Sequence, residues 1–340
     1  MQDWLVPLLK CPATGEGLQL DAGEKRDEFG IVEGTLRSSS GKTYPIVRGV
    51  PRFVQEHYAT GFGFQWNTHN KTQIDRFSTD HSEQRFWGET GFTPETIKDK
   101  LIIDGGCGAG RFTDIASAAG ARVVAIDLSS AVDACYELNR DRENVCVVQA
   151  SLFDLPFADQ TFDHGFTIGV IQHTPDPLRA LRTLAAKIRK GGELGVSWYK
   201  KYWYTYLHQK YLLRPIIKPF FRDDEKLYRF VNWYVPKLLP ISRAIQKVAR
   251  VPEFADRILP VANRDYIDGL DKEQQLEWAV LDTYDWYNPA YDRPQSWKAV
   301  QKTLSDLGYE YERAPLERRG LHATRTEIRG GTALGAKQAA

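Results

Sequence analysis

The chain has 340 residues, of which 42% are hydrophobic, and its formal net charge is +1. This length accommodates one large domain with an appendage or two modest domains, and the composition is typical of a globular protein with an apolar core. A net charge so close to zero excludes a strongly basic or acidic chain and points to no class of partner. The first residues, MQDWLVPLLKCP, lack the pattern of a leader, and no apolar run approaches the length of a membrane span, so we expect a cytoplasmic protein.

The residue pattern divides the chain into five sections. Residues 1–55 are rich in turn residues and alternate with period two, which predicts small β-hairpins. Residues 56–100 predict a helical linker or lid. Residues 101–199 alternate between strand and helix patterns, as a parallel sheet covered by helices does. Residues 200–280 predict a helical insert after the fifth strand of this sheet, and the strand–helix rhythm resumes over 281–330.

The predicted elements of the sheet follow from buried apolar runs bounded by glycine, proline and capping residues. Strands are predicted at 101–104, 122–127, 144–150, 162–170, 193–199, 309–314 and 322–329. Helices are predicted at 110–119, 129–140, 175–190 and 294–307, the second opening on capping serines and the third stopped by Gly191 and Gly192.

A glycine-rich loop, DGGCGAG over 104–110, connects the first of these strands to a helix. Glycines at 106, 108 and 110 allow a tight turn and a close approach of the backbone to a ligand. A helix N-terminus directly after the loop adds free N–H donors. The loop therefore predicts a nucleotide-binding site.

The glycine spacing and two acidic residues distinguish this loop from a dinucleotide-binding loop. Dinucleotide sites prefer GxGxxG, whereas the spacing here is GxGxG, and Asp104 precedes the glycines. An acid at that place is poorly suited to a diphosphate and well suited to the ammonium group of a methionine moiety. Asp127, at the end of the second strand, is placed to accept hydrogen bonds from ribose hydroxyls, although taken alone it is equally a helix N-cap.

Four segments, IIDGGCGAGRF, VVAIDLS, SLFDLPFADQTFDHGFTIGVIQHTPDP and IRKGGELGVSWY, resemble the motif series of the class I (Rossmann-like) methyltransferases in order and spacing. The resemblance covers residues 60–200 and, more weakly, 280–330. It implies an α/β fold with a seven-stranded, mostly parallel sheet whose last strand is antiparallel. It also implies S-adenosyl-L-methionine as cofactor and S-adenosyl-L-homocysteine as product.

By position, the resemblance implies specific cofactor contacts. Asp104 lies near the methionine end, Asp127 holds the ribose, and Leu128 packs beside the adenine. Ser151 stands where the family commonly has an aspartate for the adenine amine. Arg111 either reaches the cofactor carboxylate or forms an exposed salt bridge. The remaining implied contacts are Gly105, Gly106, Cys107, Gly108, Gly110, Leu152, Phe153, Ile168 and Gly169.

Residues 1–55 resemble the small zinc-ribbon-like domain that accompanies or activates some methyltransferases, through CPATG near the start and YPIVRGVP near the end. The zinc ligands are largely missing, because Thr14 stands where a second cysteine would complete CxxC and Ser38–Ser40 stand at the other cysteine positions. One thiol cannot hold a tetrahedral zinc, so we expect a β-rich segment without metal. No metal is expected elsewhere in the chain.

His173, just past the fourth strand, is the candidate general base, because it lies at the carboxyl edge of the sheet where ligands of this fold class bind. It is equally consistent with a plain loop residue of the pocket. Candidate acceptor-site residues are Gln65 and Trp66 on the N-terminal side, and Asp285, Trp286 and Tyr291 in DTYDWYNPAYD. The aromatic members of this set are alternatively core or linker anchors.

The helical insert is unusually aromatic and basic. Between Lys200 and Arg250 there are twelve basic and three acidic residues, and thirteen aromatics lie between Trp198 and Tyr234. Three interpretations remain open: a two-faced lid, a lid that also binds an anionic or lipid-linked acceptor or an anionic membrane surface, and a nucleic-acid-binding surface. The last is least favoured, because no recognised RNA module is present.

These patterns predict a methyltransferase acting on a small-molecule acceptor, by O-methylation of a natural product, sugar or lipid-linked metabolite. Two alternatives are an RNA methyltransferase and a cofactor-binding scaffold without catalysis.

Overall fold

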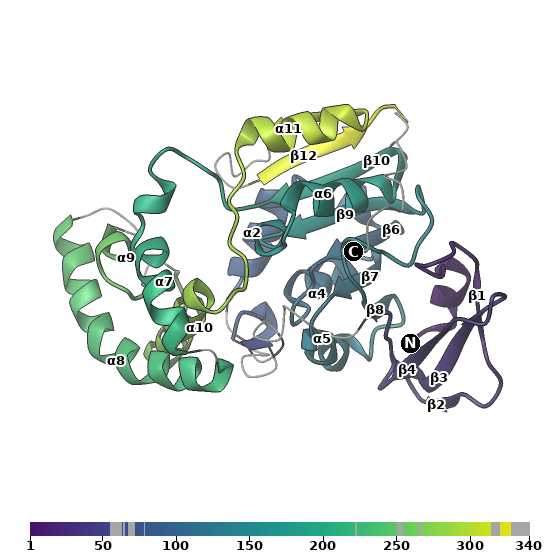
Figure 1. Ribbon diagram of the computed structural model, residues 1–340, viewed down its shortest axis with the longest axis horizontal. Helices are drawn as coiled ribbons and strands as arrows, with labels where there is room; N and C mark the ends of the chain where they lie inside the picture. The colour runs from purple at the N-terminus through teal and green to yellow at the C-terminus, as the bar shows by residue number, and fades with distance from the viewer. Residues whose placement is uncertain are drawn as a thin grey trace.

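The computed structural model describes residues 1–54, 63, 65–66, 72–77, 79–221, 223–249, 254–264, 267–313 and 320–327. Parts of the expected linker and of the C-terminal section therefore lie outside the described residues. An α/β domain occupies the centre, a small β-rich unit from the N-terminus lies at one end, and a helical lobe lies at the other (Figure 1).

The central sheet has seven strands in the order β11-β12-β10-β9-β6-β7-β8. Neighbouring strands are parallel except where β12 pairs antiparallel with β10 and β11. This confirms the expected seven-stranded, mostly parallel sheet with an antiparallel last strand. The strands are β6 (Leu101–Gly105), β7 (Arg122–Asp127), β8 (Val145–Gln149), β9 (Phe162–Ile168), β10 (Ile188–Ser197), β11 (Tyr309–Arg313) and β12 (Gly320–Arg325).

The two faces of the sheet are covered differently. Val123 and Ala125 of β7 face the helices α2 (His81–Thr90), α4 (Arg111–Ala118) and α5 (Ala131–Asn139), with the short α3 (Pro94–Ile97) beside them. Val124 and Ile126 face the core that α6 (Pro177–Ala186) and α11 (Trp297–Asp306) complete. Burial on both faces explains why β7 and β8 are continuous apolar runs instead of alternating ones.

The N-terminal unit covers part of the second face. The connection from β8 to β9 is fully described and contains no helix. Leu5 and Leu9 instead join Val124, Ile126 and Val148 in one buried cluster. The unit consists of η1 (Asp3–Leu8), β1 (Leu18–Leu20), β2 (Lys25–Asp27), β3 (Gly30–Ser38), β4 (Thr43–Val47) and β5 (Val50–Pro51).

Hydrogen bonds connect the positions that zinc ligands would take. The Cys11 thiol lies 3.1 Å from the Tyr44 hydroxyl. Glu16 Oε2 accepts hydrogen bonds from Thr14 and from the amide and hydroxyl of Ser40, which hold the pKa of the Glu16 carboxyl down at about 2. Over the residues with a described structure, no group of three His, Cys, Asp or Glu side chains is arranged to hold a metal.

Three of the predicted helices have at least one end that was wrong by two residues or more. The helix expected from 294 begins at Trp297, after the N-cap Ser296. The helix expected at 175–190 ends at Ala186, and Gly191 and Gly192 lie inside β10, where its register with β9 shifts between Ile188 and Glu193. The glycines therefore form an irregularity in a strand and do not stop a helix. The helix expected from 129 begins at Ala131, because the amide and hydroxyl of Ser129 are committed to Asp127.

The helical lobe contains η4 (Thr205–Leu207), α7 (Gln209–Phe220), α8 (Asp224–Ala249), α9 (Phe254–Ile258) and α10 (Lys272–Tyr287). α8 and α10 share a core of their own that includes Val231, Val235, Ala279 and Tyr284. The lobe therefore extends to Tyr287, past the boundary expected at residue 280. None of the described helices is both long and apolar enough to cross a membrane.

Candidate active site

The glycine loop follows β6 and leads into α4. Gly106, Gly108 and Gly110 all have positive φ, at 96°, 53° and 90°. The amides of Gly106 and Cys107 donate to the Ile126 carbonyl at 2.8 and 2.9 Å, which ties the loop to β7. A Cβ at position 106 would overlap the Val170 side chain, so only glycine fits there.

Asp127 closes this loop from the end of β7. The Gly108 amide donates to Asp127 Oδ2 at 3.0 Å, and the Ser129 amide and hydroxyl donate to Oδ1 at 2.9 and 2.8 Å. Burial raises the pKa of the Asp127 carboxyl, although these hydrogen bonds oppose the rise. The Asp127 side chain is half-buried.

Asp104 lies beneath the loop. It is buried and accepts a 2.7 Å hydrogen bond from the Thr113 hydroxyl on α4. Burial raises the pKa of the Asp104 carboxyl to about 7. Asp104 therefore links the end of β6 to the first turn of the helix that follows the loop.

The residues assigned to the adenine lie at the carboxyl ends of β7 and β8. The Leu128 carbonyl accepts from Gln149 Nε2 at 2.9 Å. Leu152 is buried near Gly105, and Phe153 lies 4.9 Å from the Arg179 guanidinium carbon. The Ser151 hydroxyl accepts a 3.1 Å hydrogen bond from the Phe153 amide. One of its hydrogen-bonding positions is therefore used within the turn after β8.

Arg111 is not an exposed salt-bridging residue. It is buried, and its Nε and Nη1 donate at 2.7 Å to Ser82 and Gln73. Its Nη2 is buried and has no hydrogen-bond partner among the described residues. Burial lowers the pKa of Arg111 to about 9, which makes an additional anionic partner favourable.

Trp66 lies close to the loop. The Trp66 indole lies over Gly108, where an added Cβ would be 3.2 Å from Nε1. Gln65, the preceding residue, is buried, and its side-chain carbonyl oxygen has no hydrogen-bond partner in the described part of the chain. The structure thus places Trp66 next to the glycine loop.

The turn after β9 connects the glycine loop to a second group of side chains, which surrounds His173. Ile168 is buried at the end of β9, and Gly169, at φ 71°, donates its amide to the Ser197 carbonyl at 2.8 Å. Val170 packs against Gly106, and its carbonyl accepts from the His173 amide at 2.8 Å. His173 therefore lies one turn of η3 (Ile171–His173) from the loop.

His173 is buried against the segment that follows α10. Its Nδ1 lies 3.1 Å from the Tyr291 carbonyl, and its ring meets the Tyr199 ring edge-on at 5.4 Å. Because a carbonyl can only accept, Nδ1 carries the proton in this contact, and a neutral ring then has its lone pair on Nε2.

Acidic and basic groups surround this histidine. The Tyr199 hydroxyl donates to Asp285 Oδ2 at 3.3 Å. Asp292 forms ion pairs with Lys210 at 3.0 Å and Arg214 at 3.4 Å. Burial raises the pKa of Asp285; it also favours a higher pKa for Asp292, but Lys210, His173 and Arg214 outweigh it, so the pKa of Asp292 lies below its ordinary value.

Several members of this second group were missed in the sequence. They come from four segments: η3 (Gln172), the residues after β10 (Tyr199), α7 (Lys210 and Arg214) and the residues after α10 (Asp292). The one available signal was the place of Tyr199 at the end of the strand expected over 193–199. Trp286, expected near the acceptor, lies instead in the core of the helical lobe, with His208 edge-on at 5.4 Å.

Comparison with known proteins concerns the same region. Residues 103–196 match the family model described as a methyltransferase domain. The O-methyltransferase rstn1 of Aspergillus nomiae is 30% identical over 119 residues, covering 34% of this chain and 53% of that protein. The ubiquinone biosynthesis O-methyltransferase of Coxiella burnetii is 28% identical over 129 residues, covering 36% and 55%.

The chain spans about half the length of these curated relatives. Among solved structures, the YcgJ protein from Bacillus subtilis aligns with a TM-score of 0.38 and 14% identity, over 65% of this chain and 68% of that chain. The matched region 103–196 contains the glycine loop and the strands that position it, so this part of the chain is similar to a methyltransferase domain in sequence, and the seven-stranded sheet has the form that the resemblance to class I methyltransferases implied.

Proposed function

We propose that this chain transfers the methyl group of S-adenosylmethionine to an oxygen atom of a small-molecule acceptor. The observation that carries the proposal is the glycine loop, whose left-handed residues leave the backbone bare and whose Gly108 amide is fixed to Asp127. The two relatives described above are named as O-methyltransferases, which favours oxygen as the methylated atom.

The residues around the loop fit the cofactor. Asp127 offers a half-buried carboxylate for ribose hydroxyls, and the bare loop backbone allows close approach. Buried Arg111 Nη2 lacks a partner among the described groups and suits a carboxylate. When bound, S-adenosylmethionine supplies an activated methyl group on a sulfonium. The protein then aligns the acceptor and excludes water, and alignment can account for roughly 7–11 kcal/mol of the barrier.

His173 is the proposed general base. The Tyr291 carbonyl holds the proton on Nδ1, so Nε2 is the atom that takes the acceptor's hydroxyl proton. Asp285 and Asp292 lie close enough to His173 to interact with it electrostatically. Positioned bases of this kind contribute about 10²–10⁴-fold to a rate.

Lys210 and Arg214 bear on the choice of acceptor. Both side chains point inward and pair with Asp292, and both are mostly buried. They are therefore not free to form a phosphate-binding stripe, which disfavours RNA as the acceptor. A small acceptor between the turn after β9 and the helical lobe fits the arrangement better.

The test combines binding and turnover on the full chain. Calorimetry with S-adenosylmethionine is expected to show binding that Asp127→Ala weakens by about 10–100-fold, since hydrogen bonds to a charged group contribute about 1.5–3 kcal/mol. Asp141→Asn, at an exposed acid after α5, is the control. Release of S-adenosylhomocysteine with a panel of phenols, hydroxyquinones and sugars tests catalysis. Binding without turnover of any acceptor would identify a scaffold instead, and absence of binding would remove the proposal.

A further inference from the structure

Helix α7 carries two sets of apolar residues. Leu213 and Ile217 pack against the core of the helical lobe. A second set is exposed and follows the i, i+3, i+4, i+7, i+8 spacing of one helix face: Leu212, Pro215, Ile216, Pro219 and Phe220. On a surface helix an apolar face normally packs on a core, so this second face is unusual.

The opposite face of α7 explains its orientation. Lys210 pairs with Asp292 at 3.0 Å, and Arg214 pairs with the same carboxylate at 3.4 Å. Lys218, one helical turn further, donates to the Pro289 carbonyl at 2.7 Å. These three cations lie four residues apart and hold the helix on the segment 288–292. The apolar face is therefore held outward by specific polar contacts.

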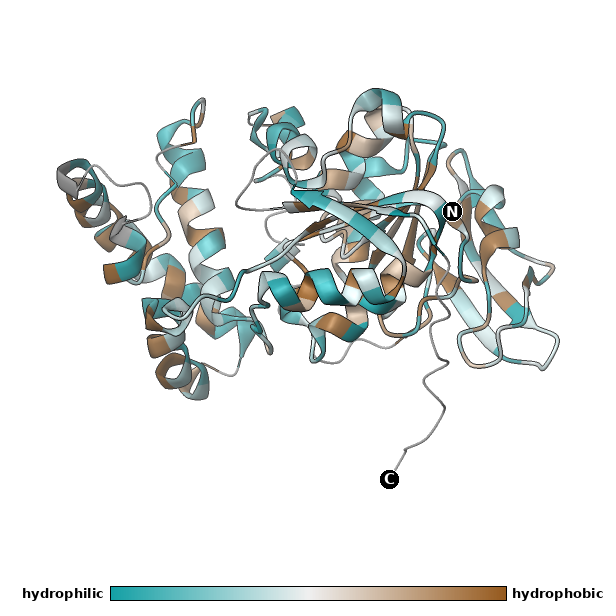
Figure 2. Ribbon diagram, turned by 90° about the horizontal axis from the view of Figure 1, so that it is seen from above, coloured by the Kyte–Doolittle hydropathy of each residue, from teal (hydrophilic) through white to brown (hydrophobic). Residues whose placement is uncertain are grey.

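The outward face continues into the segment before α7. Trp203 is 89% exposed, Phe220 79% and Ile216 60%. Leu207 and Leu212 are also exposed, and the rings of Tyr206 and Tyr211 meet at 5.2 Å across the junction of η4 with α7. Figure 2 shows hydrophobic segments on the helices of this lobe, away from the central sheet. We name Trp203, Leu207, Leu212, Ile216 and Phe220 the α7 surface.

The charges around the α7 surface select its partner. From Lys200 to Arg250 the insert contains twelve basic and three acidic residues, so it is strongly positive as a whole. Beside the α7 surface itself, Lys210, Arg214 and Lys218 are held against segment 288–292, which leaves Lys201 as the exposed cation from Trp198 to Phe221. Lys201 is exposed and its ammonium lies 5.6 Å from the Tyr206 ring. Two copies joined through this face would bring like charges together, which is unfavourable. Exposed Trp, Leu and Phe edged by lysine suit an anionic lipid surface.

We propose that the α7 surface docks this protein on an anionic lipid bilayer, with α7 lying in the interface plane. Trp203, Ile216 and Phe220 enter the boundary between headgroups and acyl chains, and Lys201 contacts the anionic headgroups. The proposal does not depend on methyl transfer, because it rests on exposed side chains and charge alone.

The test is co-sedimentation of the full chain with vesicles of phosphatidylcholine alone and vesicles enriched in phosphatidylglycerol. We expect binding that is about tenfold tighter to the phosphatidylglycerol vesicles and weakens with added salt. The double variant Ile216→Ser with Phe220→Ser should lose at least about tenfold in affinity, since both side chains are removed from the apolar phase. Lys201→Glu should remove part of the preference for phosphatidylglycerol.

Val47→Thr is the matched control. Val47 is exposed on β4 of the N-terminal unit, at the opposite end of the molecule from the helical lobe (Figure 1). This variant should bind vesicles as the wild type does. Absence of vesicle binding, or equal binding by the double variant, overturns the proposal. A third outcome would also overturn it: the wild type elutes as a dimer in size-exclusion chromatography, the double variant elutes as a monomer, and neither binds lipid. The partner of the α7 surface would then be a second copy of the chain.

Discussion

The Tyr199 hydroxyl lies 3.3 Å from Asp285 Oδ2, although 86 residues separate the two in the chain. Tyr199 lies two residues after the end of β10, and Asp285 lies in α10, so this contact joins the carboxyl edge of the sheet to the helical lobe. Burial and Asp285 together raise the pKa of Tyr199, and burial raises the pKa of Asp285. The Tyr199 hydroxyl therefore keeps its proton and its hydrogen bond to Asp285. This contact stabilises the junction between the sheet and the helical lobe, where His173 also lies.

Tyr199→Phe should destabilise the protein by about 1–3 kcal/mol, because it leaves a half-buried carboxylate without its hydroxyl donor. Urea unfolding followed by circular dichroism measures the change. Tyr204→Phe, at an exposed ring in the same segment, should change the free energy of unfolding by less than about 0.5 kcal/mol. Equal effects of the two substitutions would contradict a structural role for the Tyr199–Asp285 contact.

His173→Gln should lower kcat by about 10²–10⁴-fold while leaving the affinity for S-adenosylmethionine unchanged, because the proposed base is distinct from the cofactor loop. Single-turnover release of S-adenosylhomocysteine and calorimetry measure the two quantities. The variant has its control in Asp127→Ala, for which the cofactor affinity should fall. Turnover at the wild-type rate would exclude His173 as the base.

Gly106→Ala should destabilise the protein and weaken cofactor binding, because the new methyl group would overlap Val170 in addition to the strain of a positive φ. Gly191→Ala is the matched control: φ is 76° there, and an added Cβ meets no atom within 4 Å. The control should therefore show only the backbone strain of about 1–2 kcal/mol. Equal losses at the two positions would show that contact with Val170 does not matter.

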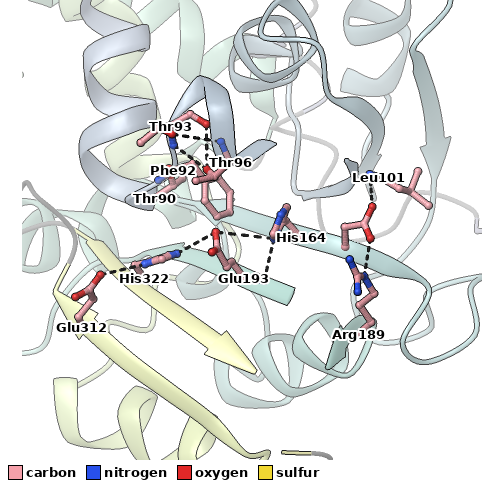
Figure 3. Close-up of polar contacts among 11 residues, drawn as sticks. Thr90, Phe92, Thr93, Thr96, Leu101, His164, Arg189, Glu193, Glu312 and His322 are labelled. Atoms are coloured by element: carbon pink, nitrogen blue, oxygen red, sulfur yellow. Dashed lines mark hydrogen bonds and ion pairs between the residues drawn. The ribbon is translucent and has the colours of Figure 1, made fainter. Parts of the chain in front are cut away.

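A histidine–glutamate cluster at the other end of the sheet predicts a pH-dependent stability (Figure 3). Glu193 lies 3.4 Å from His322 Nε2, and its amide donates to His164 Nδ1 at 3.0 Å. The ion pair with Glu193 raises the pKa of His322, so its contribution is present below 6.5 and lost as pH rises. The bond with His322 lowers the pKa of Glu193, so that contribution is present above 4.5 and lost as pH falls.

His322→Gln should therefore destabilise most between these values, by about 1–2 kcal/mol near pH 5.5, and less at higher pH. His164 provides the opposite trend, because burial lowers its pKa and folding opposes its protonation. His164→Gln should cost more stability at high pH than at low pH. Urea unfolding across this pH range measures both, and parallel profiles for the two variants would refute the assignment.

Leu9→Ala should cost about 2–5 kcal/mol, because Leu9 is fully buried between the N-terminal unit and the sheet. Since Leu9 shares one core with Val148 and Ile126, thermal unfolding should remain a single transition at a lower temperature. Two separate transitions in calorimetry would show that the N-terminal unit folds independently.

Local chemistry explains which expectations from the sequence held. Buried β-branched runs predicted the strands at 101–104 and 122–127, and the spacing of the glycines predicted the loop, because both depend on neighbours in the chain. Gly191 and Gly192 led to a wrong helix end because that prediction also considered only neighbours in the chain. Glycine pairs are common after helices, and only the register of β10 against β9 shows that these belong to a strand.

The sequence by itself determined the sheet, the glycine loop and the place of Asp127 at the end of β7, because strand propensity, positive φ and the spacing of acids are local properties. The tertiary structure alone decided the rest. It placed the N-terminal unit over β8 where no helix follows, buried Trp286 in the helical lobe, and joined Tyr199 to Asp285. It also held the basic side of α7 against Asp292, while Ile216 and Phe220 of the same helix remain exposed. Such contacts depend on how distant segments pack.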